Sequence, residues 1–125
     1  MEEEVRKIKP VFVDDRGTIT DILEEVVGHV GIITSKAGSI RAKHYHKEST
    51  QYTYVINGKV EFKTNDFREE NSKIKSVILE SGDLIITPPM IVHKMIFLED
   101  TVFLDMTTKS RKDGGFERDT IRVDI

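Results

Sequence analysis

Apolar and polar residues alternate in short runs along most of this chain, which is the pattern of strands that bury one face. The runs are rich in Val, Ile, Thr, Tyr and Phe, and clusters of Gly, Asp, Asn, Ser and Pro separate them. No window keeps a helical spacing of apolar residues over three turns, and only "TDILEEVV" (20–27) hints at a short helix. The pattern predicts strands at residues 10–14, 18–25, 29–35, 39–46, 51–56, 59–64, 73–80, 83–88, 93–99, 101–107 and 119–124.

The strongest turn signal is Asn57-Gly58, which separates the runs "YVI" and "KVEF". Both central residues of a type I′ turn need positive φ, so this pair predicts a β-hairpin. The polar stretch 65–73 ("NDFREENSK") predicts a solvated hairpin loop. Short strands at this spacing are typical of an all-β sandwich or barrel. Because no linker or internal repeat interrupts them, we expect a single domain over residues 1–125.

Composition narrows the classes of partner. Hydrophobic residues make up 38% of the 125 residues and charged residues 33%, as in soluble globular proteins. The net charge is −3 and the basic residues are scattered, which argues against nucleic acid or an anionic membrane as the main partner. The chain has no cysteine, so disulfides and thiolate metal sites are excluded. The N-terminus "MEEEVRKIKP" lacks the apolar stretch of a secretory signal, and we expect a cytoplasmic protein.

Candidate chemistry concentrates in "RAKHYHKESTQ" (41–51). Residues i and i+2 of a strand point to the same face, so His44 and His46 project together and Tyr45 points the other way. Gln51 has the wrong parity for that face, and residues 47–50 must bend or bulge to bring it round. Glu48 has the right parity in an unbent strand, so it remains a reserve ligand.

The spacing of these residues resembles the first motif of the cupin superfamily, G-x5-H-x-H-x3,4-E-x6-G. Gly38, His44, His46, Gln51 and Gly58 fall in register with that motif, with glutamine in place of the glutamate.

The second cupin motif, G-x5-P-x-G-x2-H-x3-N, matches at Gly82, Pro88 and His93, with Met90 in place of glycine and Phe97 in place of asparagine. The resemblance implies a double-stranded β-helix, the cupin jelly-roll barrel, with a site inside it. It also implies a divalent transition metal, one of Zn, Mn, Fe, Ni or Co, and ligand affinity alone does not choose among these ions. The implied metal ligands are His44, His46, Gln51 and His93.

Two further stretches resemble the nucleotide-sugar branch of the cupins. "FVDDRGTITDILE" (12–24) is similar to the F-x-D-x-R-G opening of dTDP-4-keto-6-deoxyhexose 3,5-epimerases, and "RAKHYHK" (41–47) resembles motifs of those epimerases and of the 3,4-ketoisomerases. That branch needs no metal: the resemblance implies that His44 is the base and that Arg41, with Lys43 or Lys47, lies near phosphate. In a straight strand, however, Arg41 and Lys43 do not share the face of His44.

These observations lead to one hypothesis with two alternatives. The hypothesis is a small metal-binding cupin that isomerises or epimerises a carbohydrate or sugar nucleotide by proton transfer next to a carbonyl, as in polysaccharide biosynthesis. We assign catalytic roles to His44, Arg41 and Tyr45, with Lys43 and Asp105 as further supporting groups. The alternatives are a metal-dependent dioxygenase with the same ligands and a cupin that binds a sugar or metabolite without catalysis.

Other features suggest assembly. Tyr52, Tyr54 and Ile56 share one face of their strand, and we expect a homodimer packed through that sheet because amphipathic aromatics often mark interfaces. The C-terminal stretch 110–125 is interpreted as an edge strand crossing to a partner or as a lid, in which Arg111 and Arg118 have no assigned role. Arg16 is either a solvated turn residue or a residue at the mouth of the site. His29 is interpreted as a packed or half-exposed strand residue.

Overall fold

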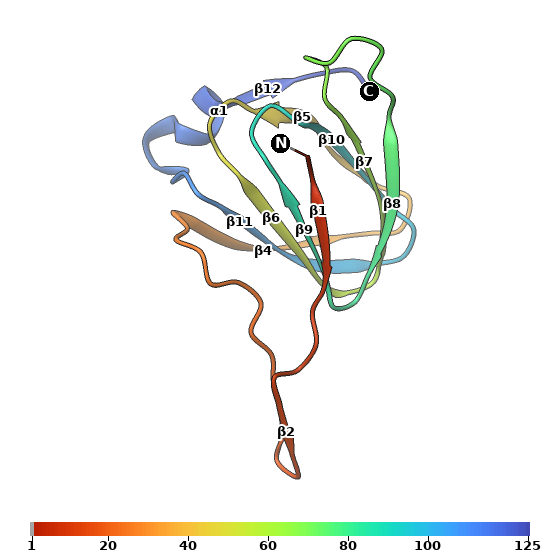
Figure 1. Ribbon diagram of the computed structural model, residues 1–125, viewed down its shortest axis with the longest axis vertical. Coiled ribbons are helices and arrows are strands. Elements are labelled where there is room, and N and C mark those ends of the chain that lie inside the picture. Colours follow the sequence, from red (N-terminus) through yellow and green to blue (C-terminus); the bar gives the residue numbers. More distant parts are fainter. Residues whose placement is uncertain (1) are drawn as a thin grey trace.

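The computed structural model describes residues 2–125, which form two five-stranded antiparallel sheets and a separate two-stranded hairpin (Figure 1). The strands are β1 Glu4–Lys7, β2 Phe12–Asp14, β3 Gly17–Ile19, β4 His29–Ser35, β5 Ile40–His46, β6 Gln51–Asn57, β7 Lys59–Asn65, β8 Lys75–Glu80, β9 Asp83–Thr87, β10 Val92–Phe97, β11 Thr101–Thr107 and β12 Thr120–Arg122. One sheet has the order β1-β9-β6-β11-β4, and the other has the order β12-β5-β10-β7-β8.

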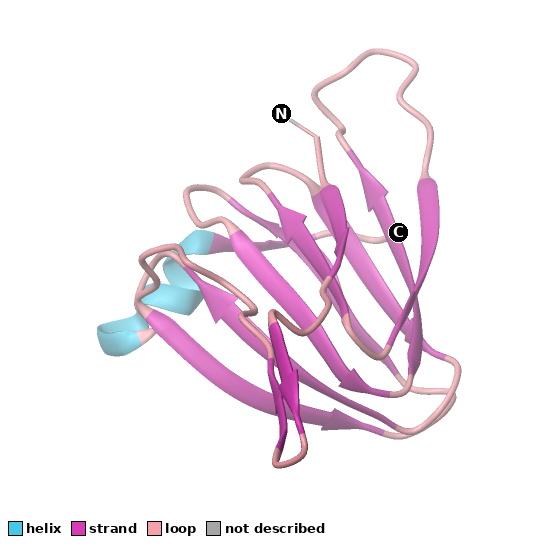
Figure 2. Cartoon of the chain, turned by 60° about the horizontal axis from the view of Figure 1, so that its bottom comes forward, coloured by secondary structure: helices cyan, strands magenta, loops and turns pink. Residues whose placement is uncertain are grey.

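The two sheets enclose a common apolar core. Phe97 and Phe103 come from opposite sheets and stack with ring centroids 5.7 Å apart. Figure 2 shows that the described chain is almost entirely strand and loop, with helix at one place only. This arrangement confirms the predicted all-β jelly roll. The core is formed by Val55, Val60, Phe62, Leu79, Ile85, Met95, Phe97 and Phe103.

The predicted strands are present with ends shifted by at most two residues, apart from one at the N-terminal end. The prediction of a strand over 18–25 is wrong beyond Ile19, and the hinted helix at 20–27 is absent from the structure, which has no regular element there. Ile22, Leu23 and Val27 are instead half-buried and pack, as irregular chain, against the outer face of the sheet that contains β6. Their apolar character reflects this packing. The segment is not a strand, because no neighbouring strand pairs with it.

Strand β1 was missed because its side chains carry no alternating pattern. All four of its residues are exposed, and the strand is defined by its backbone ladder with the edge strand β9. Lys7 adds an ion pair of 2.8 Å between its Nζ and Oδ2 of the buried Asp83.

Asn57-Gly58 does not form the predicted hairpin. Strands β6 and β7, which it joins, belong to different sheets, so the chain crosses from one layer to the other at this point. Gly58 alone of the two has positive φ, at 121°. A Cβ atom at Gly58 would lie 2.4 Å from Oγ1 of Thr101, so this crossing requires glycine for close packing as well as for its backbone angle. The predicted hairpin loop between β7 and β8 is confirmed.

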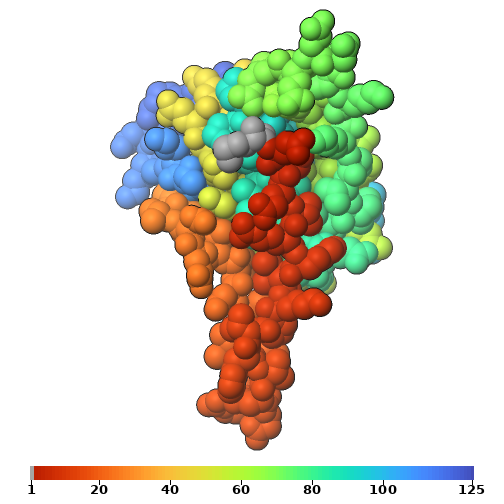
Figure 3. Space-filling model, in the orientation of Figure 1, coloured from red at the N-terminus to blue at the C-terminus, as the bar shows by residue number. Residues whose placement is uncertain are grey.

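The hairpin of β2 and β3 projects from the body of the protein as an arm (Figures 1 and 3). The chain around the arm covers part of the sheet that carries the tyrosines. Tyr52 is only 7% exposed, since it packs with Leu84, Met106 and the N-terminal segment. The chain itself therefore covers Tyr52, and the homodimer expected through this sheet stays a prediction.

The C-terminal stretch contains the helical part of the protein. A 3₁₀ turn at Lys112–Gly114 and the short helix α1 at Gly115–Asp119 precede β12, which pairs with β5 of the same chain. The helix escaped sequence prediction because five residues are too few to show a periodic pattern. Within residues 2–125, no helix is long and apolar enough to cross a membrane.

Candidate functional site

Three histidines meet between the sheets. His44 and His46 extend from β5, and His93 lies directly opposite His44 on the adjacent strand β10. All three are buried, and one ring nitrogen from each can be chosen so that all lie within 4.8 Å of one another. The centroid of the His44 ring lies 4.8 Å from that of His46 and 4.6 Å from that of His93. The structure thus brings together the three histidines that the spacing singled out.

Gln51 joins this cluster from the other sheet. The chain leaves β5 after His46, turns through 47–50 and enters β6 at Gln51, so the bend inferred from parity is present. Oε1 of Gln51 lies 3.0 Å from Nε2 of His46. Glu48 points elsewhere: its carboxylate is exposed and lies 3.8 Å from Nζ of Lys109. Gln51 rather than Glu48 is therefore the fourth polar group of the cluster.

A β-bulge in β5 changes the direction of its side chains. Ala42 and Lys43 have φ of 72° and 60°, and the pairing with β10 shifts register at this point. As a result Arg41 and His44 line the same cavity, contrary to the expectation from a straight strand. Lys43 instead lies 3.6 Å from Oδ1 of Asp124, on the side away from the cavity.

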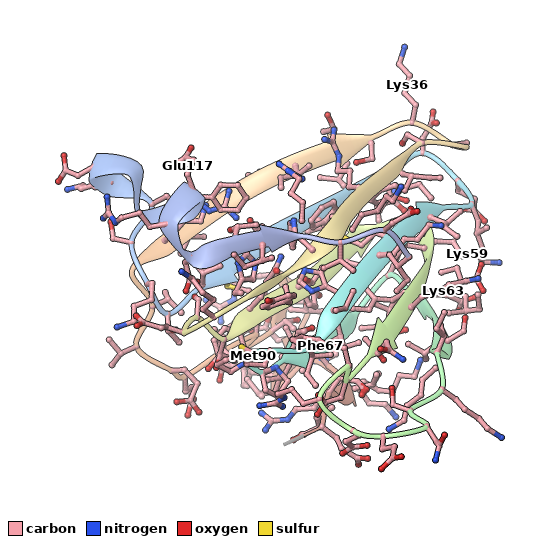
Figure 4. The ribbon with its side chains drawn as sticks, turned by 90° about the horizontal axis from the view of Figure 1, so that it is seen from above. Lys36, Lys59, Lys63, Phe67, Met90 and Glu117 are labelled. Carbon is pink, nitrogen blue, oxygen red and sulfur yellow. The ribbon has the colours of Figure 1, made fainter. Side chains whose placement is uncertain are left out.

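The cavity has a volume of about 320 Å³, within the range of small-molecule sites. Besides His44, Gln51 and Arg41, three residues of the C-terminal stretch line it: Arg111, Phe116 and Arg122. The ring centroid of Phe116 lies 6.1 Å from that of His44, and Cζ of Arg111 lies 4.4 Å from the Phe116 centroid. The stretch interpreted as a possible lid thus forms one wall of the cavity. Viewed from above, this segment, marked by Glu117, lies over one end of the barrel (Figure 4).

The histidines are kept neutral by their surroundings. Burial lowers the pKa of His44 to about 2, and the nearby His93, His46, Arg122 and Arg111 act in the same direction. Burial also lowers the pKa of His93 to about 4 and lowers the pKa of His46. At neutral pH each imidazole is therefore uncharged and carries one lone pair.

Hydrogen bonds leave the three rings in different states. Nδ1 of His93 lies 3.2 Å from the carbonyl oxygen of Ile91, which only accepts, so Nδ1 carries the proton and Nε2 has the lone pair. That Nε2 atom and both ring nitrogens of His44 are buried without a hydrogen-bond partner in the described chain. Buried polar atoms without partners are costly. The donor set of three imidazoles and the Gln51 oxygen fits a divalent transition metal.

Two of the remaining predicted residues, Tyr45 and Arg16, lie outside the cavity. The ring of Tyr45 packs on Phe67 with centroids 4.8 Å apart, on the face of β5 opposite His44. Arg16 is at the tip of the arm and pairs with Asp14, with 2.6 Å between Nη2 and Oδ2. Asp105, in contrast, faces inward and lines the cavity. Arg111 and Arg122 were not singled out for the site, because nothing in their sequence context marks them beyond their charge.

Comparison with known proteins places this geometry in a family. The model of the polysaccharide biosynthesis C-terminal domain matches residues 12–114. A germin-like protein of Arabidopsis thaliana (subfamily 3 member 2) is 31% identical over 83 residues, which cover 66% of this chain. The chain spans about a third of the length of that relative, 35%.

Solved structures share the fold along nearly the whole chain. A double variant of the QdtA 3,4-ketoisomerase from Thermoanaerobacterium thermosaccharolyticum, solved with TDP, has a TM-score of 0.73 and 26% identity. The match covers 97% of this chain and 87% of that one. A histidine-to-asparagine mutant of the same enzyme was solved with TDP-4-keto-6-deoxyglucose. The Mycobacterium tuberculosis rmlC epimerase has a TM-score of 0.78 at 18% identity and covers 96% of this chain and 68% of its own.

Proposed function

The chain belongs to the family of polysaccharide biosynthesis C-terminal domains, within the cupin superfamily, and from this premise we propose that it is a sugar-nucleotide isomerase or epimerase. One observation carries the proposal: a neutral histidine, His44, faces a cavity lined by arginines and has no hydrogen-bond partner among residues 2–125 at either ring nitrogen. A base of this kind removes a proton next to a carbonyl. The 3,4-ketoisomerases and the epimerase that share this fold support sugar nucleotides as the substrate class.

The arginines suit a substrate with a diphosphate. Arg41, Arg111 and Arg122 line the cavity beside His44, and guanidinium groups bind phosphate oxygens in a bidentate manner. Arg41 is held in place because its Nε donates to Oγ of Ser35 at 2.7 Å and its Nη2 donates to the carbonyl of Thr34 at 3.0 Å. We propose that these cations hold the diphosphate and place the sugar ring beside His44.

The first step, removal of a proton, needs one proton-accepting group. Neutral His44 takes the proton from the carbon next to the sugar carbonyl, so a C–H bond breaks, an N–H bond forms, and the electron pair moves to the carbonyl oxygen as an enolate. Inversion of that carbon additionally requires a second donor, other than His44, that delivers a proton to the opposite face. Return of the proton to the former carbonyl carbon, together with transfer of a hydroxyl proton between the two oxygens, moves the carbonyl by one position.

Substrate binding adjusts the base. Arg122 and Arg111 contribute to the low pKa of His44, which is about 2 without substrate. A bound diphosphate offsets these positive charges, and closure of the cavity around an anionic intermediate favours the protonated imidazole. Substrate therefore offsets the part of the lowered pKa of His44 that the two arginines cause, while burial, the largest cause, stays in place.

The test is product formation from TDP-4-keto-6-deoxyglucose, the ligand of one of the related ketoisomerase structures, followed by proton NMR. We expect a new keto-sugar isomer or epimer with the wild-type protein and a loss of about 100-fold or more with His44→Asn. His29→Asn is the matched control, because His29 lies on β4 and does not line the cavity. Binding without turnover by the wild-type protein contradicts catalysis on this substrate and favours the sugar-binding alternative.

A divalent metal at the same cluster is the second candidate, favoured by the three convergent histidines. His44, His46, His93 and Gln51 would hold the ion, which when bound polarises the substrate carbonyl as a Lewis acid. His44 would then be occupied as a ligand, so this reading assigns proton transfer to another group. Elemental analysis of tag-free protein separates the two: about one equivalent of metal, absent from a His44→Ala/His93→Ala variant, supports the metal. Iron would favour the dioxygenase alternative, and a metal-free protein that cannot be loaded supports His44 as the base.

A further inference from the structure

Asp105 lines the cavity beside the histidine cluster, and among the described residues its hydrogen bonds reach that cluster through Gln51. Its carboxylate is buried on β11, at 1% exposure, with both oxygens engaged. Oδ1 accepts a hydrogen bond of 2.7 Å from Nε2 of Gln51, and Oδ2 accepts one of 2.5 Å from Nη2 of Arg111. This residue was expected from the sequence only as a supporting group without a stated task, and neither the base nor the metal reading gives it one.

These two contacts determine which atom donates in each hydrogen bond from Asp105 through Gln51 to His46. A carboxylate only accepts, so the Gln51 atom facing Asp105 must be its amide nitrogen, and its carbonyl oxygen must face His46. That oxygen also only accepts, so Nε2 of His46 must carry the proton. Nδ1 of His46 then has the lone pair, and it accepts from the hydroxyl of Thr120 at 3.1 Å.

We propose that Asp105 is a positioning residue that fixes the orientation of the Gln51 amide and, through it, the Nε2–H tautomer of His46. Arg111 pairs with the Asp105 carboxylate and holds it in place, and it also stacks on Phe116 in the cavity wall. Two side chains, Asp105 and Gln51, thus link Arg111 of the C-terminal stretch to the proton on His46.

The consequence for catalysis rests on the proposed function. With its proton directed to Gln51 and its lone pair directed to Thr120, His46 neither gives nor takes a proton in the cavity. His44, whose ring nitrogens have no partner within the described residues, is left to do so. A metal ion would reverse this state, because coordination through Nε2 requires the proton of His46 to move to Nδ1, where Asp119 lies 3.8 Å away.

The tautomer can be measured directly on the whole protein. In chelator-treated protein labelled with ¹⁵N-histidine at pH 8, long-range ¹H–¹⁵N correlation spectra distinguish protonated from unprotonated ring nitrogens. His46 is assigned by the loss of its signals in His46→Asn. We expect Nε2–H in the wild-type protein, and an Nδ1–H tautomer would overturn the proposal.

Asp105→Asn makes the test sharper because it keeps the shape of the side chain. Arg111 carries a full charge and takes the single remaining acceptor oxygen, so the new amide nitrogen faces Gln51. Gln51 must then turn its oxygen toward residue 105 and its nitrogen toward His46, and we expect His46 to change to Nδ1–H. An unchanged Nε2–H tautomer in folded Asp105→Asn protein would overturn the assignment.

The controls cover failure to fold and failure of the proposed function. Thr87→Val removes a buried hydroxyl that has no partner in the described chain and leaves all the bonds above intact, so its spectrum should match the wild type. If Asp105→Asn does not fold, Gln51→Met removes the acceptor of the Nε2 proton and should also shift His46 to Nδ1–H; retention of Nε2–H would count against the proposal. No substrate is present, so an inactive protein that shows the expected tautomers would reject the proposed reaction without touching this inference.

Discussion

His93 is a polar ring buried in the site, and its burial affects both the chemistry of the site and the stability of the fold. It is fully enclosed, stacks on Phe62 with ring centroids 5.7 Å apart, and has one nitrogen without a partner among the described residues. A buried imidazole of this kind is stable only when neutral, because charging it would require desolvation of a cation. The same property that makes the cluster able to accept protons or cations therefore makes the fold sensitive to acid.

We predict that metal-free protein loses stability as the pH falls below about 6.5. The unfolded imidazole of His93 titrates near 6.5 and the folded one near 4, so between these values only the unfolded chain binds the proton. Above 6.5 both states are neutral and this residue adds no pH dependence. The loss by pH 5 should be about 2 kcal/mol from His93, measured by urea unfolding at pH 7 and pH 5.

His93→Gln supplies the control for this prediction, since it removes the titrating group at the same position. Its free energy of unfolding should fall less between the two pH values than that of the wild-type protein. An equal fall in the free energy of unfolding of the two proteins would show that His93 is not the source of the acid sensitivity.

At the scale of elements, the bulge in β5 aligns the base with the anion-binding residues. Ala42 and Lys43 both adopt left-handed backbone angles there, and Met90, which replaces a glycine of the second cupin motif, does so too, with φ of 71°. The related motif R-G-x-H has glycine at the position of Ala42. The positive φ at this position explains that glycine, because only glycine adopts such angles without strain. The bulge, and not the strand parity alone, places Arg41 and His44 on one cavity.

Substitutions at Ala42 test the bulge. We expect Ala42→Gly to keep the fold and to change the free energy of unfolding by at most about 1 kcal/mol, because relief of strain offsets the added chain entropy. Ala42→Val should destabilise by about 1–3 kcal/mol, since a β-branched residue is strained at positive φ. Chemical unfolding of both variants gives the comparison, and equal stabilities would contradict the left-handed backbone at this position.

The sequence was informative where a pattern has a direct physical meaning. Spacing along one strand predicted that His44 and His46 converge, and the cupin spacing added Gln51 and His93. Arg111, Phe116 and Arg122 were missed because their place in the cavity follows from how the C-terminal stretch returns to β5, which no local pattern encodes. The crossing at Asn57-Gly58 was misread for the same reason, since a turn signal does not reveal which sheet the next strand joins.

At the scale of the whole molecule, the arm and one edge of the sheet leave apolar side chains uncovered. Phe12 and Val13 on the arm are 50% and 67% exposed, and Val30 and Ile32 on β4 are 58% and 69% exposed. Apolar surface of this extent on a small protein is typical of an association surface. The homodimer expected from the sequence therefore remains a prediction. We now expect its interface to contain these exposed apolar residues and not the tyrosines.

Sedimentation velocity checks this prediction. We expect the wild-type protein to sediment as a dimer and a Phe12→Ser/Val13→Ser variant to sediment as a monomer at the same concentration. Thr18→Ser on the opposite strand of the arm is the control and should remain dimeric. A monomeric wild-type protein would contradict the predicted assembly.

The central claim, that His44 exchanges a proton with the carbon next to a sugar carbonyl, is tested most directly by deuterium incorporation. TDP-4-keto-6-deoxyglucose is incubated with the protein in D₂O, and the loss of the adjacent C–H signal is followed by NMR. The account predicts rapid exchange with the wild-type protein and with His29→Asn, and exchange slowed about 100-fold or more with His44→Asn. Equal exchange by the wild-type protein and His44→Asn, or none above the protein-free rate with the wild type, would contradict it.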